Sequence, residues 1–247
     1  MTPPLFLVAE LGSELATGDS IVLTGPEAHH AGTVKRLSPG EVVWLADGRG
    51  ALAETTVASV TRDRVVFTVL RRRAVAERSP RFAVAQALPK GERAELAVEA
   101  LTELGVDEIL PWAAARSITQ WRADKAERGV AKWRRVAEEA SKQSRRARVP
   151  LVSELTSTPA LADRVAAASL ALLLHEDAGQ PLASVVVPDH GEVLLVVGPE
   201  GGLGEDELAA LEGRGARRVR LGPEVLRTST AGAAALAVLS ERAGRWR

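Results

Sequence analysis

The chain has 247 residues, of which 46% are hydrophobic and 26% are charged, and its formal net charge is zero. This length allows one or two domains with a packed core, and the balanced charge means that any contact with nucleic acid must depend on local clusters of basic residues. Cysteine is absent, which excludes disulfides, thiolate metal sites and mechanisms with a cysteine nucleophile. The sequence shows no basic and apolar leader and no apolar run of about 18 residues, so we expect a soluble, cytoplasmic protein.

The N-terminal part, residues 1–72, is rich in short apolar runs that Gly, Pro and Asp separate. Such runs are typical of strands joined by tight turns. The segment therefore predicts a small β-barrel or sandwich. Its expected strands are residues 5–9, 21–24, 42–46, 52–60 and 64–70.

Between two of these strands, residues 26–37 predict a short helix that carries His29, His30, Lys35 and Arg36. Adjacent side chains on a helix point about 100° apart, and no third ligand lies nearby in the sequence. We therefore predict no metal site here, and a helix cap or partial burial is the common fate of such histidines.

The second part of the chain, residues 73–247, follows a charged segment at 71–80 that is expected to act as a hinge. Strand patterns alternate here with a helical pattern at 91–104, in which Gly105 follows as the terminating residue. This alternation predicts a parallel sheet with crossover helices. The expected strands are residues 82–88, 106–111, 170–174, 193–197 and 217–221.

A long helical pattern covers residues 122–148, with a possible break near Gly129. It ends in four cations, which a solvated surface or the helix dipole would explain. The same cations would also suit contacts with RNA phosphates, and the residue pattern alone does not separate the two. These cations are Lys142, Arg145, Arg146 and Arg148.

Three of the expected strands end in loops, at residues 175–177, 198–204 and 222–223. Open α/β sheets bind ligands at such strand ends, and glycine lets the backbone approach a ligand closely. The glycine spacing fits neither the dinucleotide pattern G-x-G-x-x-G nor the phosphate loop. Glu205, Asp206 and Glu207 in the next helical turn would repel a polyphosphate, so S-adenosylmethionine with its positive sulfonium is the favoured ligand. A tight turn with an acidic helix cap is the alternative.

The last expected helix, residues 230–239, is apolar on nearly every side. Such a helix must be covered all round. The protein's own sheet and a second subunit would cover it, so we expect a homodimer.

Five segments, taken in order, resemble the bacterial 16S ribosomal RNA uridine-N3 methyltransferases, the RsmE family of the SPOUT superfamily. The likeness covers nearly the whole chain. The segments are HHAGTVKRLSPGEVVWLADGRG at 29–50, EALTELGVDEILPWAAARSI at 99–118, EEASKQSRRARVP at 138–150, GPEGGLGEDEL at 198–208 and LGPEVLRTSTA at 221–231.

The resemblance implies a PUA-like β-barrel domain that binds RNA, residues 1–72, before a trefoil-knotted SPOUT methyltransferase domain, residues 73–247. Strand spacing alone would predict an ordinary unknotted sheet. The resemblance also implies S-adenosylmethionine as the cofactor, and 16S ribosomal RNA or the assembled small ribosomal subunit as the partner. It implies a homodimer, without metal or membrane.

The strand-end loops and the resemblance together give the candidate site residues. Residues expected to contact the cofactor are Leu174, His175, Gly198, Pro199, Glu200, Gly201, Gly202, Leu221, Gly222, Val225, Leu226 and Thr228. Residues expected to contact RNA are His30, Lys35, Arg36, Arg116, Arg145 and Arg146.

Arg227 is the best candidate for stabilising charge on the pyrimidine, because the start of a helix disfavours a cation and its presence there calls for an anion or a carbonyl partner. A salt bridge to Glu200 or Glu224 is the alternative. Glu200 is a second catalytic candidate, which would assist deprotonation or hold the ribose. Many family members carry arginine in place of Glu224 and glutamate in place of Ser229, so a cationic loop contact and an essential acid are not expected at these positions.

Three other functions compete with this one. The glycine spacing disfavours a Rossmann-like oxidoreductase. A non-catalytic RNA-binding protein would use the N-terminal barrel alone. A SPOUT enzyme that methylates a ribose 2′-hydroxyl is the nearest alternative.

Overall fold

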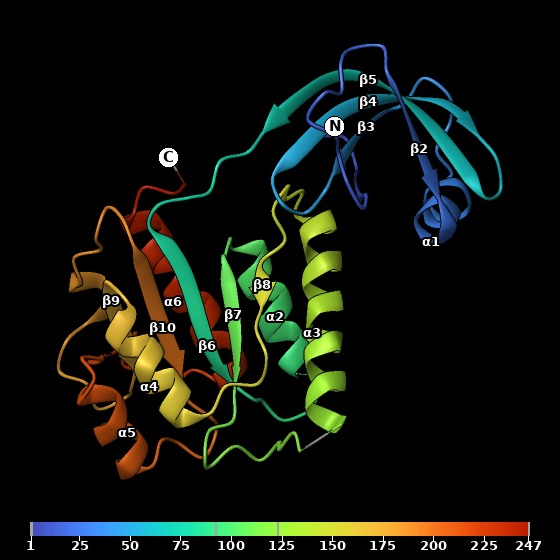
Figure 1. Cartoon of the computed structure of the whole chain (residues 1–247). Helices are drawn as coiled ribbons and strands as arrows, with labels where there is room; N and C mark the ends of the chain where they lie inside the picture. The colour runs from blue at the N-terminus through green and yellow to red at the C-terminus, as the bar shows by residue number, and fades with distance from the viewer. Residues whose placement is uncertain (1, 92, 123, 247) are drawn as a thin grey trace. The chain divides into compact units, whose positions relative to one another are not determined.

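The computed structural model describes residues 2–91, 93–122 and 124–246 (Figure 1). The chain forms two compact units, each built from two stretches of sequence. Met1–Glu77 and Ser141–Val149 form the first, and Arg78–Ala140 and Pro150–Arg247 form the second. The division between residues 72 and 73 that the sequence suggests stays a prediction.

The first unit is a curled sheet of five strands in the order β1-β3-β4-β5-β2 (Figure 1). β1 runs parallel to β3, and the other neighbours are antiparallel. Alternate side chains such as Val43, Leu45 and Phe67 are fully buried on one face, as a half-covered sheet requires. The expected PUA-like β domain is confirmed. Its strands are β1 (Leu5–Leu7), β2 (Ser20–Thr24), β3 (Val42–Ala46), β4 (Ala51–Val60) and β5 (Arg64–Ala74).

Two expectations for this unit need correction. The predicted helix at 26–37 is instead a short helix, α1 (Gly25–His29), followed by a π-helical turn, η1 (His30–Val34). The predicted hinge at 71–80 begins as strand, because β5 continues to Ala74 along β4. The arginines of the expected hinge, Arg71 to Arg73, therefore lie in β5, next to a shift in its register with β4.

The stretch Ser141–Val149 completes the first unit. Lys142 forms an ion pair with Glu27 at 2.9 Å, and Arg148 Nε donates to the Val75 carbonyl at 2.9 Å. Ala147 joins a small apolar cluster with Leu5, Ala46 and Leu52. This distant segment therefore covers one end of the sheet.

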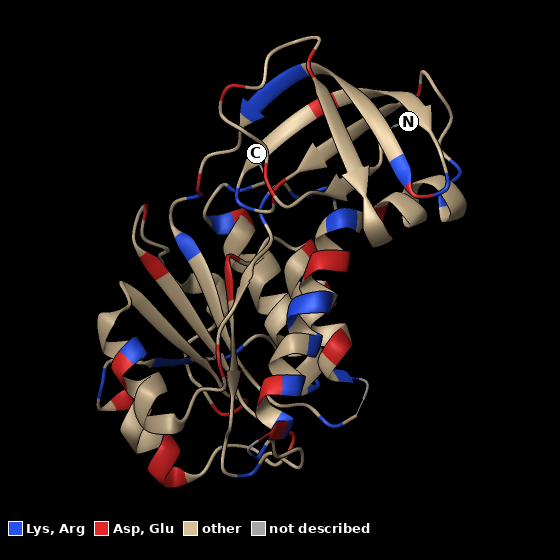
Figure 2. Ribbon diagram, turned by 45° about the vertical axis from the view of Figure 1, so that its right-hand side comes forward, with Lys and Arg blue, Asp and Glu red and all other residues tan. Residues whose placement is uncertain are grey.

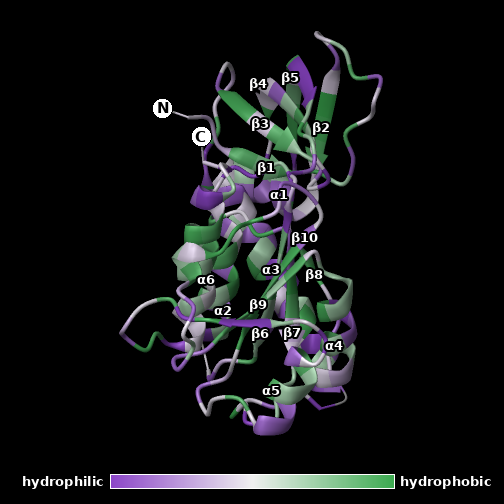
Figure 3. Ribbon diagram, turned by 90° about the vertical axis from the view of Figure 1, so that its left-hand side faces the viewer, coloured by the Kyte–Doolittle hydropathy of each residue, from purple (hydrophilic) through white to green (hydrophobic). Residues whose placement is uncertain are grey.

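The second unit contains six parallel strands in the order β11-β9-β10-β6-β7-β8. The predicted parallel sheet is confirmed, and its strands carry mostly hydrophobic residues (Figure 3). Such continuous apolar runs are expected where both faces are covered. The strands are β6 (Arg81–Ala87), β7 (Glu108–Trp112), β8 (Leu151–Val152), β9 (Leu170–Leu174), β10 (Glu192–Val197) and β11 (Arg217–Val219).

Helices cover both faces of this sheet. α2 (Arg93–Glu103) and α6 (Thr228–Arg242) pack together on one face, and α4 (Thr158–Ala167) and α5 (Glu205–Glu212) pack together on the other (Figure 1). A short 3₁₀ turn, η2 (Leu182–Ser184), also contacts α6. No helix in the part of the chain that the structure describes is both long and apolar enough to cross a membrane.

Helix α3 (Asp124–Gln143) differs from its prediction in two ways. It runs unbroken through Gly129, and the glycine is explained by the Trp121 indole, which an added Cβ would meet at 2.5 Å. It ends before Arg145, whose φ of 58° is left-handed, so only Lys142 of the basic cluster is helical. Figure 2 shows acidic and basic residues side by side along this helix.

Helix α4 and strand β8 are absent from the expectations. The start of α4 has a recognisable signal, because the Ser157 hydroxyl accepts from the Ala160 N–H and a proline occupies the first turn. β8 has only two residues, too few for a periodic pattern.

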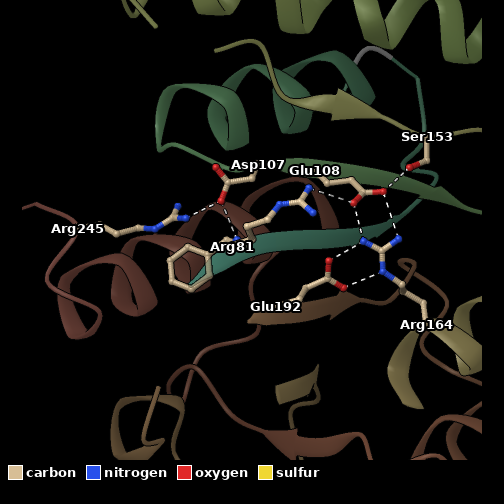
Figure 4. A network of polar contacts seen from close by, with 8 residues as sticks. Arg81, Asp107, Glu108, Ser153, Arg164, Glu192 and Arg245 are labelled. Carbon is tan, nitrogen blue, oxygen red and sulfur yellow. Dashed lines mark hydrogen bonds and ion pairs between the residues drawn. The ribbon is translucent and has the colours of Figure 1, made fainter. Parts of the chain in front are cut away.

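A network of charged side chains joins three strands near their amino ends (Figure 4). Arg164 donates to Glu192 at 2.7 Å and to Glu108 at 2.6 Å, and Ser153 donates to Glu108 at 2.6 Å. The hydrogen bond to Glu192, together with Glu108, raises the pKa of Arg164 above its ordinary value. Glu192 begins β10 and Glu108 begins β7, so Arg164 links these strands to α4.

We expect Arg164→Ala to lower the free energy of unfolding by about 2–4 kcal/mol, because it leaves the buried Glu108 without its main partner. Urea unfolding would measure the loss. Arg218→Ala is the matched control, since Arg218 pairs with Glu212 at the surface and should matter little. Equal shifts for the two variants would show that the network does not stabilise the sheet.

Candidate active site

The loops that follow β9, β10 and β11 meet around a cavity of about 340 Å³. They meet because β11, β9 and β10 are adjacent and parallel, so their carboxyl ends share one edge of the sheet. The start of α6 closes the cavity with Arg227, Thr228 and Ala231. The three strand ends that the sequence indicated are therefore brought together.

Most of the predicted cofactor residues line this cavity. Gly201 is the exception, and the roles of all these residues stay predictions. The predicted residues that line the cavity are Leu174, His175, Gly198, Pro199, Glu200, Gly202, Leu221, Gly222, Val225, Leu226, Arg227 and Thr228.

Gly201 lies instead against the neighbouring loop. A Cβ on Gly201 would meet the Arg116 carbonyl oxygen at 2.9 Å, closer than real Cβ contacts come. The next residue, Gly202, has a φ of 71°, which L side chains rarely adopt. The first glycine therefore permits close packing of two loops, and the second permits the turn that faces the cavity.

Hydrogen bonds tie this loop to its neighbours. The Glu200 carboxylate accepts from the Lys90 N–H at 3.3 Å, and the Thr119 hydroxyl donates to the Pro89 carbonyl at 2.9 Å. Glu207 accepts from the N–H groups of Ala115 at 2.9 Å and Gly204 at 3.1 Å. The loops after β6, β7 and β10 are therefore hydrogen-bonded to one another.

The acidic helix start does not face the cavity, which corrects one step of the sequence argument. Glu205 and Asp206 are exposed, and Glu207 is buried among the loops. The carboxylates that line the cavity are those of Glu176, Glu200 and Glu224. The negative charge at the cavity therefore comes from other residues than expected, and Arg220 and Arg227 in the same lining partly balance it.

Arg227 lies at the N-cap of α6, with φ and ψ of −65° and 149°. Its side chain is exposed at the cavity, and within residues 2–91, 93–122 and 124–246 it forms no hydrogen bond or ion pair. The alternative salt bridge to Glu200 or Glu224 is thus not present. The guanidinium is available to a ligand.

Several residues of the cavity were not among the predicted ones. Arg220 directly follows β11, and Glu176 is the second residue after β9. Both had a usable signal, because polar residues at strand ends are the usual ligand contacts. Val197, Leu203 and Ala231 are apolar, so nothing in their residue type distinguishes them from core. The additional lining residues are Glu176, Val197, Leu203, Arg220, Glu224 and Ala231.

The predicted RNA contacts are divided between the units. Lys35 and Arg36 are exposed in the first unit, and His30 is half-buried with its ring 6.2 Å from that of Phe6. Arg116 is exposed in the second unit.

Arg145 and Arg146, also in the first unit, come directly after α3. The Arg145 guanidinium donates to the carbonyls of Pro3 at 3.2 Å and Thr2 at 3.3 Å. Arg145 therefore has a structural task, and any contact of either residue with RNA stays a prediction. Among the residues that the structure describes, no cluster of three or more His, Asp or Glu side chains could hold a metal ion.

The chain matches two protein families. Residues 77–240 match the RNA methyltransferase domain, and residues 23–70 match the RNA methyltransferase PUA domain. Ribosomal RNA small subunit methyltransferase E of Mycobacterium bovis is 47% identical over 234 residues, which cover 93% of this chain and 89% of the relative. Its counterpart in Bacillus subtilis is 31% identical and covers 88% of both chains.

Two solved structures are also similar. Ribosomal RNA small subunit methyltransferase E from Neisseria gonorrhoeae, bound to S-adenosylmethionine, has a TM-score of 0.85 with 26% identity and covers 97% of this chain and 98% of its own. A methyltransferase from Legionella pneumophila, in complex with the same cofactor, has a TM-score of 0.85 with 28% identity and covers 98% of both.

The fold and the cavity thus define an RNA methyltransferase, as the sequence predicted. The chain belongs to the family of the ribosomal RNA small subunit methyltransferases E. The family resemblance is confirmed, and the trefoil knot stays a prediction.

We expect Gly201→Ala to weaken S-adenosylmethionine binding by about tenfold, because the new methyl group forces the cavity loop away from Arg116 and misplaces its backbone amides. Titration calorimetry would measure the affinity. Gly179→Ala is the control, since an added Cβ there meets no atom within 4 Å. Unchanged affinity in Gly201→Ala would refute the requirement for this loop contact.

Proposed function

We propose that the protein transfers a methyl group from S-adenosylmethionine to N3 of a uridine in 16S ribosomal RNA of the small subunit. The observation that carries the proposal is the guanidinium of Arg227, unpaired among the described residues, at the rim of the three-loop cavity. The names of the relatives support the small-subunit RNA as substrate. A cytoplasmic site of action, where small subunits are assembled, accords with this substrate.

The cavity suits this methyl donor by size and chemistry. A volume of about 340 Å³ lies in the range of small-molecule sites. Gly198, Gly202 and Gly222 let a ligand approach the backbone of the walls closely. The lining has three carboxylates, Glu176, Glu200 and Glu224, against the two guanidiniums of Arg220 and Arg227, and this balance suits a cationic donor better than a pyrophosphate. When bound, S-adenosylmethionine supplies a methyl carbon made electrophilic by its sulfonium.

The residues of the chain have two tasks in this reaction. The imide proton of uridine must leave before or during attack, and negative charge then spreads to the pyrimidine oxygens. Arg227 stabilises that charge, because a preorganised cation in a partly closed site interacts strongly with a developing anion. Glu200 accepts the proton or holds the ribose, and the Lys90 N–H fixes its carboxylate at the cavity.

The position of methylation can be tested in a strain that lacks the gene. Ribosomal RNA from that strain, digested to nucleosides and analysed by mass spectrometry, is expected to lack one N3-methyluridine. Reintroducing the gene should restore it. Loss of a 2′-O-methylated nucleoside instead would place the enzyme among the ribose methyltransferases, and retention of N3-methyluridine would exclude the proposal.

We expect Arg227→Ala to lower kcat by about a hundredfold or more, with a much smaller change in the affinity for S-adenosylmethionine, because the lost charge stabilises mainly the transition state. Initial rates on small subunits and calorimetry would give the two quantities. Arg217→Ala, an exposed arginine outside the cavity, is the control. A loss confined to cofactor affinity would assign Arg227 to binding only.

RNA binding by the first unit and by Arg116 remains part of the proposal, as do the two domains at 1–72 and 73–247. The exposed Lys35, Arg36 and Arg116 side chains support it, since phosphate contacts need accessible cations. The substrate is either naked 16S ribosomal RNA or the assembled subunit, and the set of these contacts that forms depends on which of the two is methylated.

We also propose a homodimer through α6. One side of this helix is buried against the sheet by Gly232, Leu236 and Leu239, whereas Ala234 and Ala237 on the other side are only partly covered. Leu96 of α2, which packs against α6, is also exposed, at 53%. A second copy of the chain would bury it.

Ala234→Glu should convert the dimer into a monomer, because it would bury a carboxylate in an apolar interface. Light scattering at micromolar concentration would report the mass. Glu241→Ala, an exposed position near the end of the same helix, should leave the dimer intact. A monomer for the unmodified protein would refute this part of the proposal.

A further inference from the structure

Gln86 is a polar residue within the otherwise apolar end of β6. It is 0% exposed, and it lies beside Val197, the last residue of β10. Burying an amide in a sheet is unfavourable unless its polar atoms find partners. Its place under the cavity loops therefore calls for an explanation.

The amide nitrogen of Gln86 reaches across to helix α6. It donates to the Thr228 carbonyl at 3.3 Å and to the Ala87 carbonyl at 3.1 Å. Thr228 is the first residue of α6 and directly follows Arg227, the N-cap. The contact thus fixes the backbone at the first turn of α6, directly after Arg227.

The amide oxygen of Gln86 faces the next turn of the same helix. A Cβ on Gly232 would meet this oxygen at 3.2 Å and the Val197 side chain at 3.2 Å. Glycine inside a helix costs about 1 kcal/mol relative to alanine, so close packing accounts for its presence. The Gln86 oxygen has no hydrogen-bond partner among the described residues, although buried polar atoms rarely lack one.

One buried amide thus lies against two successive turns of α6, at Thr228 and at Gly232. This arrangement fixes both the height and the rotation of the helix above the sheet. The contact with Thr228 lies at the end of the helix that borders the cavity.

We propose that Gln86 is a positioning residue for methyl transfer, which acts by holding the start of α6 so that Arg227 points into the cavity. The inference rests on the proposed role of Arg227. The cavity walls after β9 and β10 are held mainly by the sheet, whereas Thr228 at the start of α6 also lines the cavity. Loss of the Gln86 donor should therefore lower kcat strongly and change the binding of S-adenosylmethionine only slightly, through Thr228.

A double-mutant cycle tests this inference. Gln86→Met keeps the approximate shape of the side chain and removes the donor. In the unmodified background we expect kcat to fall about tenfold to a hundredfold and KM for S-adenosylmethionine to change by less than about threefold, as displacements near 1 Å can have such effects. In the Arg227→Ala background, Gln86→Met should lower kcat by less than about twofold, because residues that act as a unit are not additive.

Several outcomes would overturn the inference. An unchanged kcat in Gln86→Met, or equal losses in both backgrounds, would show that Gln86 does not act through Arg227. If Arg227→Ala itself leaves kcat unchanged, the proposed role of Arg227 fails, and the inference fails with it. The first two results leave the proposed function intact, so the two failures are distinguishable.

Two further variants guard against a loss of folding. Gly232→Ala disturbs the same contact between Gln86 and α6, because the new methyl group lies against the Gln86 amide. It should reproduce the kcat loss in the unmodified background only. Thr102→Val removes a fully buried hydroxyl that donates to the Val98 carbonyl at 2.7 Å in helix α2 of the same unit, outside the cavity. It should lower thermal stability without lowering kcat, and an equal kcat loss in Thr102→Val would assign the effect of Gln86 to general destabilisation.

Discussion

The parallel hydrogen bonding of β11, β9 and β10 is the constraint on which the site depends. In-register pairing such as Val193 with Leu170, and Arg217 with Leu172, makes these strands end at nearly the same level. The loops that follow these strands therefore lie together at the carboxyl ends of the sheet, where they surround a common cavity. The chemistry can therefore be carried by short glycine-containing loops, because a rigid sheet supplies their positions.

The two edges of this sheet are stabilised by different means. At the amino ends, Arg164 pairs with Glu108 and Glu192 and links their strands to a helix, and Arg81 adds a second cation beside Glu108 (Figure 4). At the carboxyl ends, single polar side chains such as Glu207 and Gln86 bond to backbone groups, and the Arg227 side chain has no partner among the described residues. The first arrangement uses charge for stability, and the second keeps the charge of Arg227 available for a ligand.

Much of this architecture is predictable from the sequence, because apolar runs bounded by glycine mark strands that lie in the core. The cofactor loops were found for the same reason, as each follows such a run. The break near Gly129 was predicted wrongly, since only the fold brings Trp121 over that glycine. That the Glu207 side chain points away from the cavity could not be predicted from the sequence either, because its partners Ala115 and Thr158 are distant along the chain. Apolar lining residues such as Leu203 and Ala231 have no property that separates them from core.

The discontinuous first unit has a consequence for how the chain reaches its native state. Ala147 and Arg148 complete a sheet whose strands end at Ala74, so a ribosome must add more than half of the polypeptide before this unit can close. Until then Leu5 and Leu52 lack part of their cover. A fragment cut after Glu77 would share this defect, so the two units are not independent modules that a single cleavage could separate.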